Sequence, residues 1–208
     1  VVHAEAHYLY EREDAPIIDP VPGDAELFGM VEQMHEYFRA PKTHAKNAHL
    51  LGTLSAKLHT ELSYDQFLYS EQAWKFVREH YRKYCTDPSF VDYFWTVRTM
   101  HSPIWVLARV CNGMIPVRAF HTVSTGYAGF LGALAKRKYN KPYIISEHGI
   151  YTKERKIDLF AAQWIADNRS VFQRDPTESS YFRQLWIKFF EALGRAAYDA
   201  SDNITALY

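Results

Sequence analysis

The sequence has no excess of charge of either sign, few cysteines and no long apolar run. The 24 lysines and arginines equal the 24 aspartates and glutamates, which argues against nucleic acid or an anionic membrane surface as a partner. The two cysteines, Cys85 and Cys111, form no CxxC or Cys/His pattern, so no metal site is expected. No uninterrupted apolar stretch reaches the roughly 20 residues of a membrane-spanning helix, so no direct membrane span is expected either.

The sequence does contain enough apolar residues for a core, since 48% of its 208 residues are apolar and 16% are aromatic. It begins with "VVHAEAHYLYERED", without methionine and without a signal-peptide pattern. We therefore expect a fragment of a larger protein. The two cysteines fit a reducing, cytoplasmic setting with Cys111 as a core thiol, although they could also pair with each other.

The first half of the chain carries mostly helical patterns. Residues 1–10 alternate as a strand would and 15–24 form a proline-rich connector, so 1–24 are assigned to the same α/β domain as the second half. From 25 to 112 the apolar residues recur at helical spacing, which predicts an all-helical insertion ended by Asn112 and Gly113. The residues predicted to cap its helices are Asp24, Ser63, Asp87 before Pro88, and Ser102 before Pro103.

Residues 113–208 alternate between strand and helix patterns. Strands are predicted at 116–123, 141–149 and 202–208, and helices at 124–140, 152–168 and 178–201. This alternation predicts a Rossmann-like parallel sheet with right-handed crossovers, so the expected fold class is α/β with a large helical insertion. The residues expected to face inward from the last helix are Phe182, Leu185, Phe189, Leu193 and Ala197.

A candidate site follows from this topology, because open parallel sheets bind ligands beyond the carboxyl ends of their strands. His121 and His148 each end a predicted strand, and a helix follows each, so both histidines are expected to face one crevice. Three cations, Lys153, Arg155 and Lys156, crowd the start of one helix, where the macrodipole disfavours them unless an anion binds. The planar fork of Arg155 suits a phosphate or carboxylate best.

Simpler interpretations of the same residues stay open. The lysines can point to water, and a histidine at a strand end can be a hydrogen-bonded structural residue. The glycines of "HTVSTGYAG" can serve only close helix–sheet packing, and Ser124 or Thr125 can be only a helix cap. The residues by themselves predict an anion-binding crevice and no particular reaction.

Two longer motifs, "HTVSTGYAG" (121–129) and "EHGIYTKERKIDL" (147–159), resemble the Pel exopolysaccharide glycosyltransferases (PelF type) of glycosyltransferase family 4. The resemblance implies the N-terminal, acceptor-side half of a GT-B fold and retaining transfer from a UDP-sugar to a growing exopolysaccharide, without metal or cofactor. It also implies partners in an inner-membrane secretion complex that builds biofilm polysaccharide. The C-terminal nucleotide-binding domain lies outside the sequence, so the fragment alone is expected to be inactive.

The same resemblance implies roles for individual residues. His148 matches the histidine that contacts the donor sugar near the transferred carbon, and Glu147 and Tyr151 flank it. Arg155 is expected to reach a phosphate or acceptor group. The residues expected to line the neighbouring strand end are His121, Ser124 and Thr125.

Two alternatives compete with this enzyme. One is a non-catalytic docking module for membrane partners, suggested by twelve aromatic residues between positions 64 and 105, although the same residues can simply form a core. The other, a hydrolase using two histidines, is weak because the sequence lacks a G-x-S-x-G motif and convincingly paired carboxylates.

Overall fold

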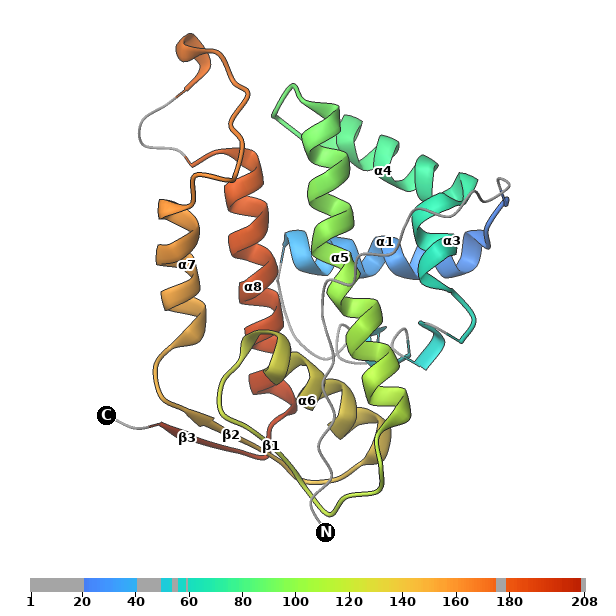
Figure 1. The fold of residues 1–208 in the computed structure, drawn as a ribbon, viewed down its shortest axis with the longest axis vertical. Helices are drawn as coiled ribbons and strands as arrows, with labels where there is room; N and C mark the ends of the chain where they lie inside the picture. Colours follow the sequence, from blue (N-terminus) through green and yellow to red (C-terminus); the bar gives the residue numbers. More distant parts are fainter. Residues whose placement is uncertain (1–20, 41–49, 54–55, 59, 175–178, 207–208) are drawn as a thin grey trace.

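The computed structural model describes residues 21–40, 50–53, 56–58, 60–174 and 179–206. The predicted strand at 1–10 and most of the predicted connector lie outside the described residues. The helices of the first half include α1 (Ala25–Arg39), α3 (Tyr64–Tyr69), α4 (Glu71–Tyr84) and α5 (Phe90–Gly113). They form the upper and right-hand part of the molecule in Figure 1.

Two of the predicted helix caps are confirmed. The Asp24 carboxylate accepts hydrogen bonds from the backbone N–H groups of Glu26 and Leu27 at the start of α1. The Ser63 hydroxyl accepts one from the N–H of Gln66, and the Gln66 side chain accepts one from the N–H of Ser63. This reciprocal pair is a capping box, and it fixes the start of α3.

Three expectations in this region are wrong. The helix predicted from Ser63 onward is broken at Ser70, which ends α3 and whose hydroxyl then caps α4 by accepting from the N–H of Ala73. Ser89, rather than Asp87, caps α5. Pro103 lies inside α5 instead of starting a new helix, and burial of its ring in the core offsets the backbone hydrogen bond that proline cannot donate.

The second half contains a three-stranded parallel sheet in the order β1 (Phe120–Thr122), β2 (Tyr143–Glu147), β3 (Asn203–Ala206). Phe120 pairs with Tyr143, and Ile145 pairs with Ile204. The connecting helices are α6 (Gly126–Tyr139) between β1 and β2, and α7 (Tyr151–Ala161) and α8 (Tyr181–Ala200) between β2 and β3. The predicted α/β class is confirmed as a mostly helical fold with a small parallel sheet.

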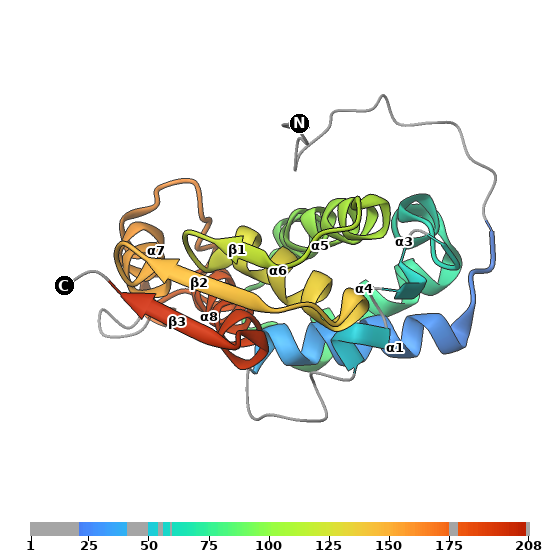
Figure 2. The same cartoon turned by 90° about the horizontal axis from the view of Figure 1, so that it is seen from below.

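The described helices all lie on one side of this sheet, as Figures 1 and 2 show together. Crossovers of one hand between strands placed side by side in chain order put their helices on the same face. The helix predicted over 152–168 ends at Ala161, and the chain continues through a loop that contains a short 3-10 helix, η1 (Val171–Gln173). In that loop the carbonyl of Ala162 accepts a hydrogen bond from the Arg183 guanidinium.

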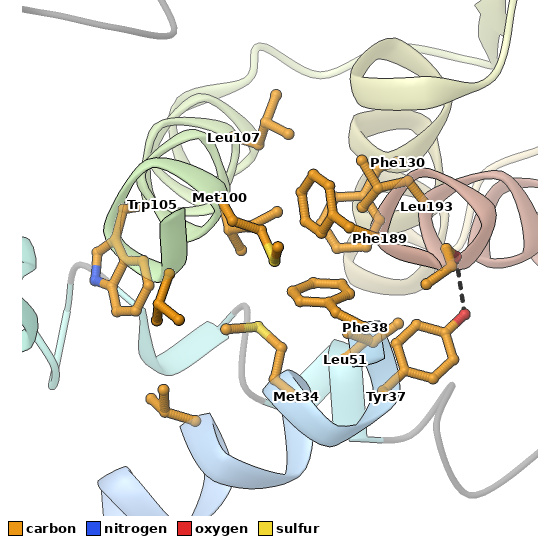
Figure 3. Packing of buried hydrophobic residues seen from close by; sticks show 14 of the residues in the cluster. Met34, Tyr37, Phe38, Leu51, Met100, Trp105, Leu107, Phe130, Phe189 and Leu193 are labelled. Carbon is orange, nitrogen blue, oxygen red and sulfur yellow. Dashed lines mark hydrogen bonds between the residues drawn. The ribbon is translucent and has the colours of Figure 1, made fainter. Parts of the chain in front are cut away.

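The two halves of the chain share one core. The five residues predicted to face inward from α8 are all buried, and most of them belong to a cluster that also contains residues of α1 and α5. Figure 3 shows Phe38 of α1 between Met100 of α5 and Phe189 of α8. The Tyr37 hydroxyl donates to the carbonyl of Ala192 at 2.9 Å, so α1 is also tied to α8 by a buried hydrogen bond. The helices of the first half therefore pack directly on the α/β part.

Candidate functional site at the strand ends

The carboxyl ends of β1 and β2 lie side by side, and a helix starts just beyond each of them. Neither α6 nor α7 has a side-chain hydrogen bond at its N-cap, which is Thr125 in one case and Ile150 in the other. The first turn of a helix carries backbone N–H groups without an intrahelical partner and the positive end of the macrodipole. Two helix starts without side-chain caps therefore adjoin one edge of the sheet, an arrangement that favours an anion.

A close contact between Gly126 and Tyr151 joins these two helix starts. Gly126 has a φ of +67°, and a Cβ atom built on it would lie 2.5 Å from Cε1 of the Tyr151 ring. The tyrosine ring therefore lies directly against the backbone at the start of α6, where only glycine fits. The same ring also lies near Phe190 of α8, with ring centroids 6.3 Å apart.

Two buried oxygens at the same edge have no hydrogen-bond partner. They are Oγ1 of Thr125, whose residue is 1% exposed, and Oε1 of Glu147, whose residue is 6% exposed. Buried polar atoms in folded proteins are nearly always paired, so each unpaired one calls for an explanation such as a ligand or water. Glu154 folds back over the turn between β2 and α7, where its Oε1 would clash with a Cβ atom on Gly149. The edge is thus lined by oxygen atoms as well as by helix starts.

His148 is the first residue beyond β2 and is exposed at this edge. His121 is placed differently. It is the middle residue of β1 and pairs with Ile144, four positions before His148 on the neighbouring strand, a separation of about 13 Å along an extended chain. Its Nε2 lies 2.9 Å from Oγ of Ser146, which also accepts a hydrogen bond from Thr205. This chain of contacts lies on the sheet face that bears no described helix.

His121 and His148 therefore do not lie side by side, and the crevice expected between them stays a prediction. The strands are neighbours, as predicted, but β1 ends at Thr122 and its side chains alternate between the two faces of the sheet. Ser124, half-buried in the turn after β1, donates its hydroxyl hydrogen to the carbonyl of Thr125. Thr125, Glu147, His148 and Tyr151 are the predicted site residues that the fold gathers at the strand ends.

The cations of α7 do not converge on its N-terminus. The Arg155 guanidinium lies over the ring of Phe190, 4.7 Å from its centroid, and its Nη1 is 4.0 Å from Asp158 Oδ2. Lys156 Nζ is 3.9 Å from Glu191 Oε1, and Lys153 is exposed. Arg155 and Lys156 thus lie along the α7–α8 contact, which explains their presence in the first turns without a bound anion.

The two glycines of "HTVSTGYAG" have different roles, one in helix packing and one at the candidate site. Gly129 faces helix α8, since a Cβ atom there would lie 2.9 Å from Cβ of Ala197, and this is the packing role. Gly126 instead makes the contact with Tyr151, which sequence reasoning missed. A signal in the sequence is the glycine itself, which stands in the first turn of the helix predicted over 124–140 and can adopt a positive φ that other residues avoid.

Across the residues that the structure describes, no three His, Cys, Asp or Glu side chains are placed to hold a metal ion. No described helix combines the length and apolar character that crossing a membrane requires.

Residues 1–208 match the family described as "Domain of unknown function (DUF3492)". No curated protein and no solved structure matches the chain.

Proposed function

The chain belongs to the DUF3492 family, and we propose that it is the N-terminal, acceptor-side domain of a retaining glycosyltransferase. In this proposal the sheet and α6–α8 are part of a Rossmann-like domain of a GT-B enzyme, and residues 25–112 are an insertion in it. The donor is a UDP-sugar and the acceptor is a growing exopolysaccharide of the Pel type. The enzyme acts in the cytoplasm with an inner-membrane secretion complex.

The observation that carries the proposal is the pair of helix starts without side-chain caps, joined by the Gly126–Tyr151 contact at the ends of neighbouring parallel strands. A sugar nucleotide combines an anionic diphosphate with a neutral ring rich in hydroxyl groups. Helix starts favour the anion, and the unpaired oxygens of Thr125 and Glu147 can exchange hydrogen bonds with hydroxyl groups. The resemblance of the two motifs to family 4 glycosyltransferases selects this ligand among other phosphorylated compounds.

His148 has the central role in the proposed reaction. A neutral imidazole at the strand end can hydrogen-bond a hydroxyl of the donor sugar, and the interaction strengthens as positive charge develops on the ring in the transition state. Glu147 and Tyr151 orient the edge around it. Arg155 contributes by holding α7 against α8 through Phe190, so we treat it as a positioning residue.

The test is turnover of a panel of UDP-sugars by the full-length protein that contains this domain, beside its His148→Ala variant. We expect kcat for the accepted donor to fall by about 10- to 100-fold in the variant, since one hydrogen bond that strengthens in the transition state is lost. Thermal unfolding should be unchanged because His148 is exposed. Equal turnover by both proteins would remove His148 from the reaction, and no turnover of any donor would reject the enzyme.

The docking-module alternative draws less support from the structure. Of the twelve aromatic residues between 64 and 105 that suggested it, only Trp74 and Trp95 are exposed, and the others are buried or half-buried. Most of this aromatic content is therefore core. Trp95 belongs instead to a pocket of different character.

A further inference from the structure

A pocket of about 240 Å³ lies between α5, the loop that follows α7, and the start of α8. Its aromatic lining includes three of the five tryptophans of the chain: Trp95, Trp164 and Trp186. Its polar lining consists of Asp92, Thr96 and Thr99 along α5. Such a combination of aromatic surface with a few polar groups is typical of small-molecule sites.

The tryptophans form a floor and two exposed walls. Trp186 is 5% exposed and forms the floor, where it is also stacked on Phe190 of the core. Trp164 is 63% exposed and stands nearly perpendicular to Trp186, at 77° with ring centroids 5.7 Å apart. Trp95 on α5 is 57% exposed. The two exposed indole rings line one pocket, and apolar surface gathered in this way is typical of an interaction site.

The charge of the pocket restricts what this partner can be. No lysine, arginine or histidine is among the described residues that line it, and one carboxylate, Asp92, is. A nucleotide or another phosphorylated ligand would gain no cationic contact here and would meet a like charge. The hydroxyl groups of Thr96 and Thr99 both donate and accept hydrogen bonds, so they suit a neutral ligand with hydroxyl groups.

The loop that carries Trp164 is fixed to α5 by a set of hydrogen bonds. The Asn168 amide nitrogen donates to Asp87 Oδ1 at 3.0 Å and to Asp92 Oδ2 at 2.7 Å, and its backbone N–H donates to Asp87 Oδ2 at 3.0 Å. The side chains of Asp167 and Arg169 form a two-point ion pair in the same loop. These contacts hold the walls of the pocket in place before a ligand arrives, which lowers the entropic cost of binding.

We propose that this pocket binds one pyranose ring of a neutral saccharide chain. One face of a pyranose presents C–H groups whose partial positive charge suits the negative face of an indole ring, while its edge carries hydroxyl groups that require hydrogen bonds. Tryptophan walls and threonine hydroxyls supply both. Pockets for drug-sized ligands measure about 300–1,000 Å³, so 240 Å³ fits a smaller unit such as a single sugar ring, with the chain continuing into solvent.

The pocket is separate from the strand-end site. Tyr151 starts α7 at the sheet edge, and the pocket lies beyond the other end of this 11-residue helix, a rise of about 16 Å. Saccharide binding here does not require the proposed reaction. Only the role of the pocket in holding an acceptor chain rests on the proposed function.

The experiment is a titration of the full chain with cellopentaose and chitopentaose, followed by tryptophan fluorescence and calorimetry at up to millimolar concentration. We expect at least one of them to bind, and Trp164→Ala to weaken binding by about tenfold or more. The matched control is Trp74→Ala, which removes another exposed indole, 50% exposed on α4, and should leave the Kd unchanged. Thr99→Val keeps the shape of the side chain and removes its hydroxyl, and should weaken binding several-fold.

Other outcomes overturn the proposal. If neither saccharide binds, or if Trp164→Ala and Trp74→Ala bind it equally, the pocket is not a saccharide site. If Thr99→Val binds more tightly, an apolar occupant such as a peptide segment is favoured instead. If His148→Ala abolishes saccharide binding while Trp164→Ala does not, the sugar binds at the strand ends, and the proposed function survives while this site fails.

Discussion

The helical region (25–113) and the α/β region (120–206) place histidine in opposite environments. In the helical region His35 and His101 are fully buried, their rings are stacked with centroids 5.1 Å apart, and the ring of His80 lies 5.2 Å from that of His35. In the α/β region His121 and His148 are exposed on or beside the sheet. The same residue type is a packing element in one region and a group open to ligands in the other.

This difference shows that the position of a polar side chain in the fold, more than its residue type, decides whether it can contact a ligand. Both ring nitrogens of His35 and Nε2 of His101 have no hydrogen-bond partner, yet they are closed off by the core. The unpaired oxygens of Thr125 and Glu147 are buried as well, but they lie beside helix starts at an edge of the sheet, next to the exposed His148. The helical region supports the fold, and the α/β region supplies the candidate active site.

The largest expected effect tests whether the two regions share one core. Phe38 is 0% exposed, and its ring lies 4.9 Å from that of Phe189 on α8. Phe38→Ala should lower the free energy of unfolding by about 3–5 kcal/mol in a single transition, because the cavity lies between the two regions. Urea unfolding, followed by both tryptophan fluorescence and far-UV circular dichroism, measures the free energy of unfolding and the number of transitions. Lys75→Ala on the exposed side of α4 is the control, and two separate transitions would mean that the regions unfold independently.

The second prediction concerns the buried histidines. Burial lowers the pKa of His101 to about 4, and burial, together with His101 and His80, holds the pKa of His35 well below its usual value. The charged groups that face this cluster are Glu32 and Glu36, each with an oxygen 3.6 Å from His80 Nε2, and Arg39.

The sign of the pH effect follows from proton binding. The unfolded chain takes up protons near pH 6.5 and folded His101 only near pH 4, so stability falls as the pH drops between these values. By pH 5 the loss from His101 alone is on the order of 2 kcal/mol. Urea unfolding at pH 7, 6 and 5 measures it. His35→Phe should reduce the slope and the exposed control His148→Ala should not, whereas stability independent of pH would mean that these rings bind protons as readily in the fold as in the unfolded chain.

The third prediction compares two glycines, one from each region. Gly126 has positive φ and lies against the Tyr151 ring, so Gly126→Ala should lower stability by about 2 kcal/mol and displace the start of α7. Gly29 lies on α1 with nothing within 4 Å of an added Cβ atom, so Gly29→Ala should raise stability by about 0.5–1 kcal/mol. Thermal unfolding of the two variants measures both effects. A rise in stability in both variants would show that position 126 accepts a side chain without strain.

The sequence predicted the features of this fold that depend on local chemistry. Helix caps at Asp24 and Ser63, the inward face of α8 and the alternation that produces a parallel sheet all follow from residues close together in the chain. The errors arose where residues far apart in the chain determine the contacts of a side chain. Ser89 caps α5, and the Asp87 carboxylate instead accepts hydrogen bonds from the N–H of Ser89 and from Asn168, 81 positions later, a pair that no local pattern indicates.

Only part of the candidate site was predicted, because part of it also depends on residues far apart in the chain. Its position at the strand ends followed from topology, and His148, Glu147 and Tyr151 lie there. The face on which His121 lies depends on where β1 ends and on its register with β2, which the apolar run at 116–123 did not define. The tryptophan pocket was missed because its walls come from α5, the loop after α7 and α8, which only folding brings together.

The smallest expected effect separates the two exposed histidines. His121 makes an exposed contact with Ser146 on the open face of the sheet, away from the helix starts. In the full-length protein, His121→Ala should therefore change UDP-sugar turnover by less than about twofold and stability by less than about 0.5 kcal/mol. His121→Ala and His148→Ala each remove one exposed imidazole. The difference between their UDP-sugar turnover therefore measures the effect of lying at the strand end. Equal losses of turnover would place the open face of the sheet within the active site, and the assignment of that site to the helix starts would then have to be abandoned.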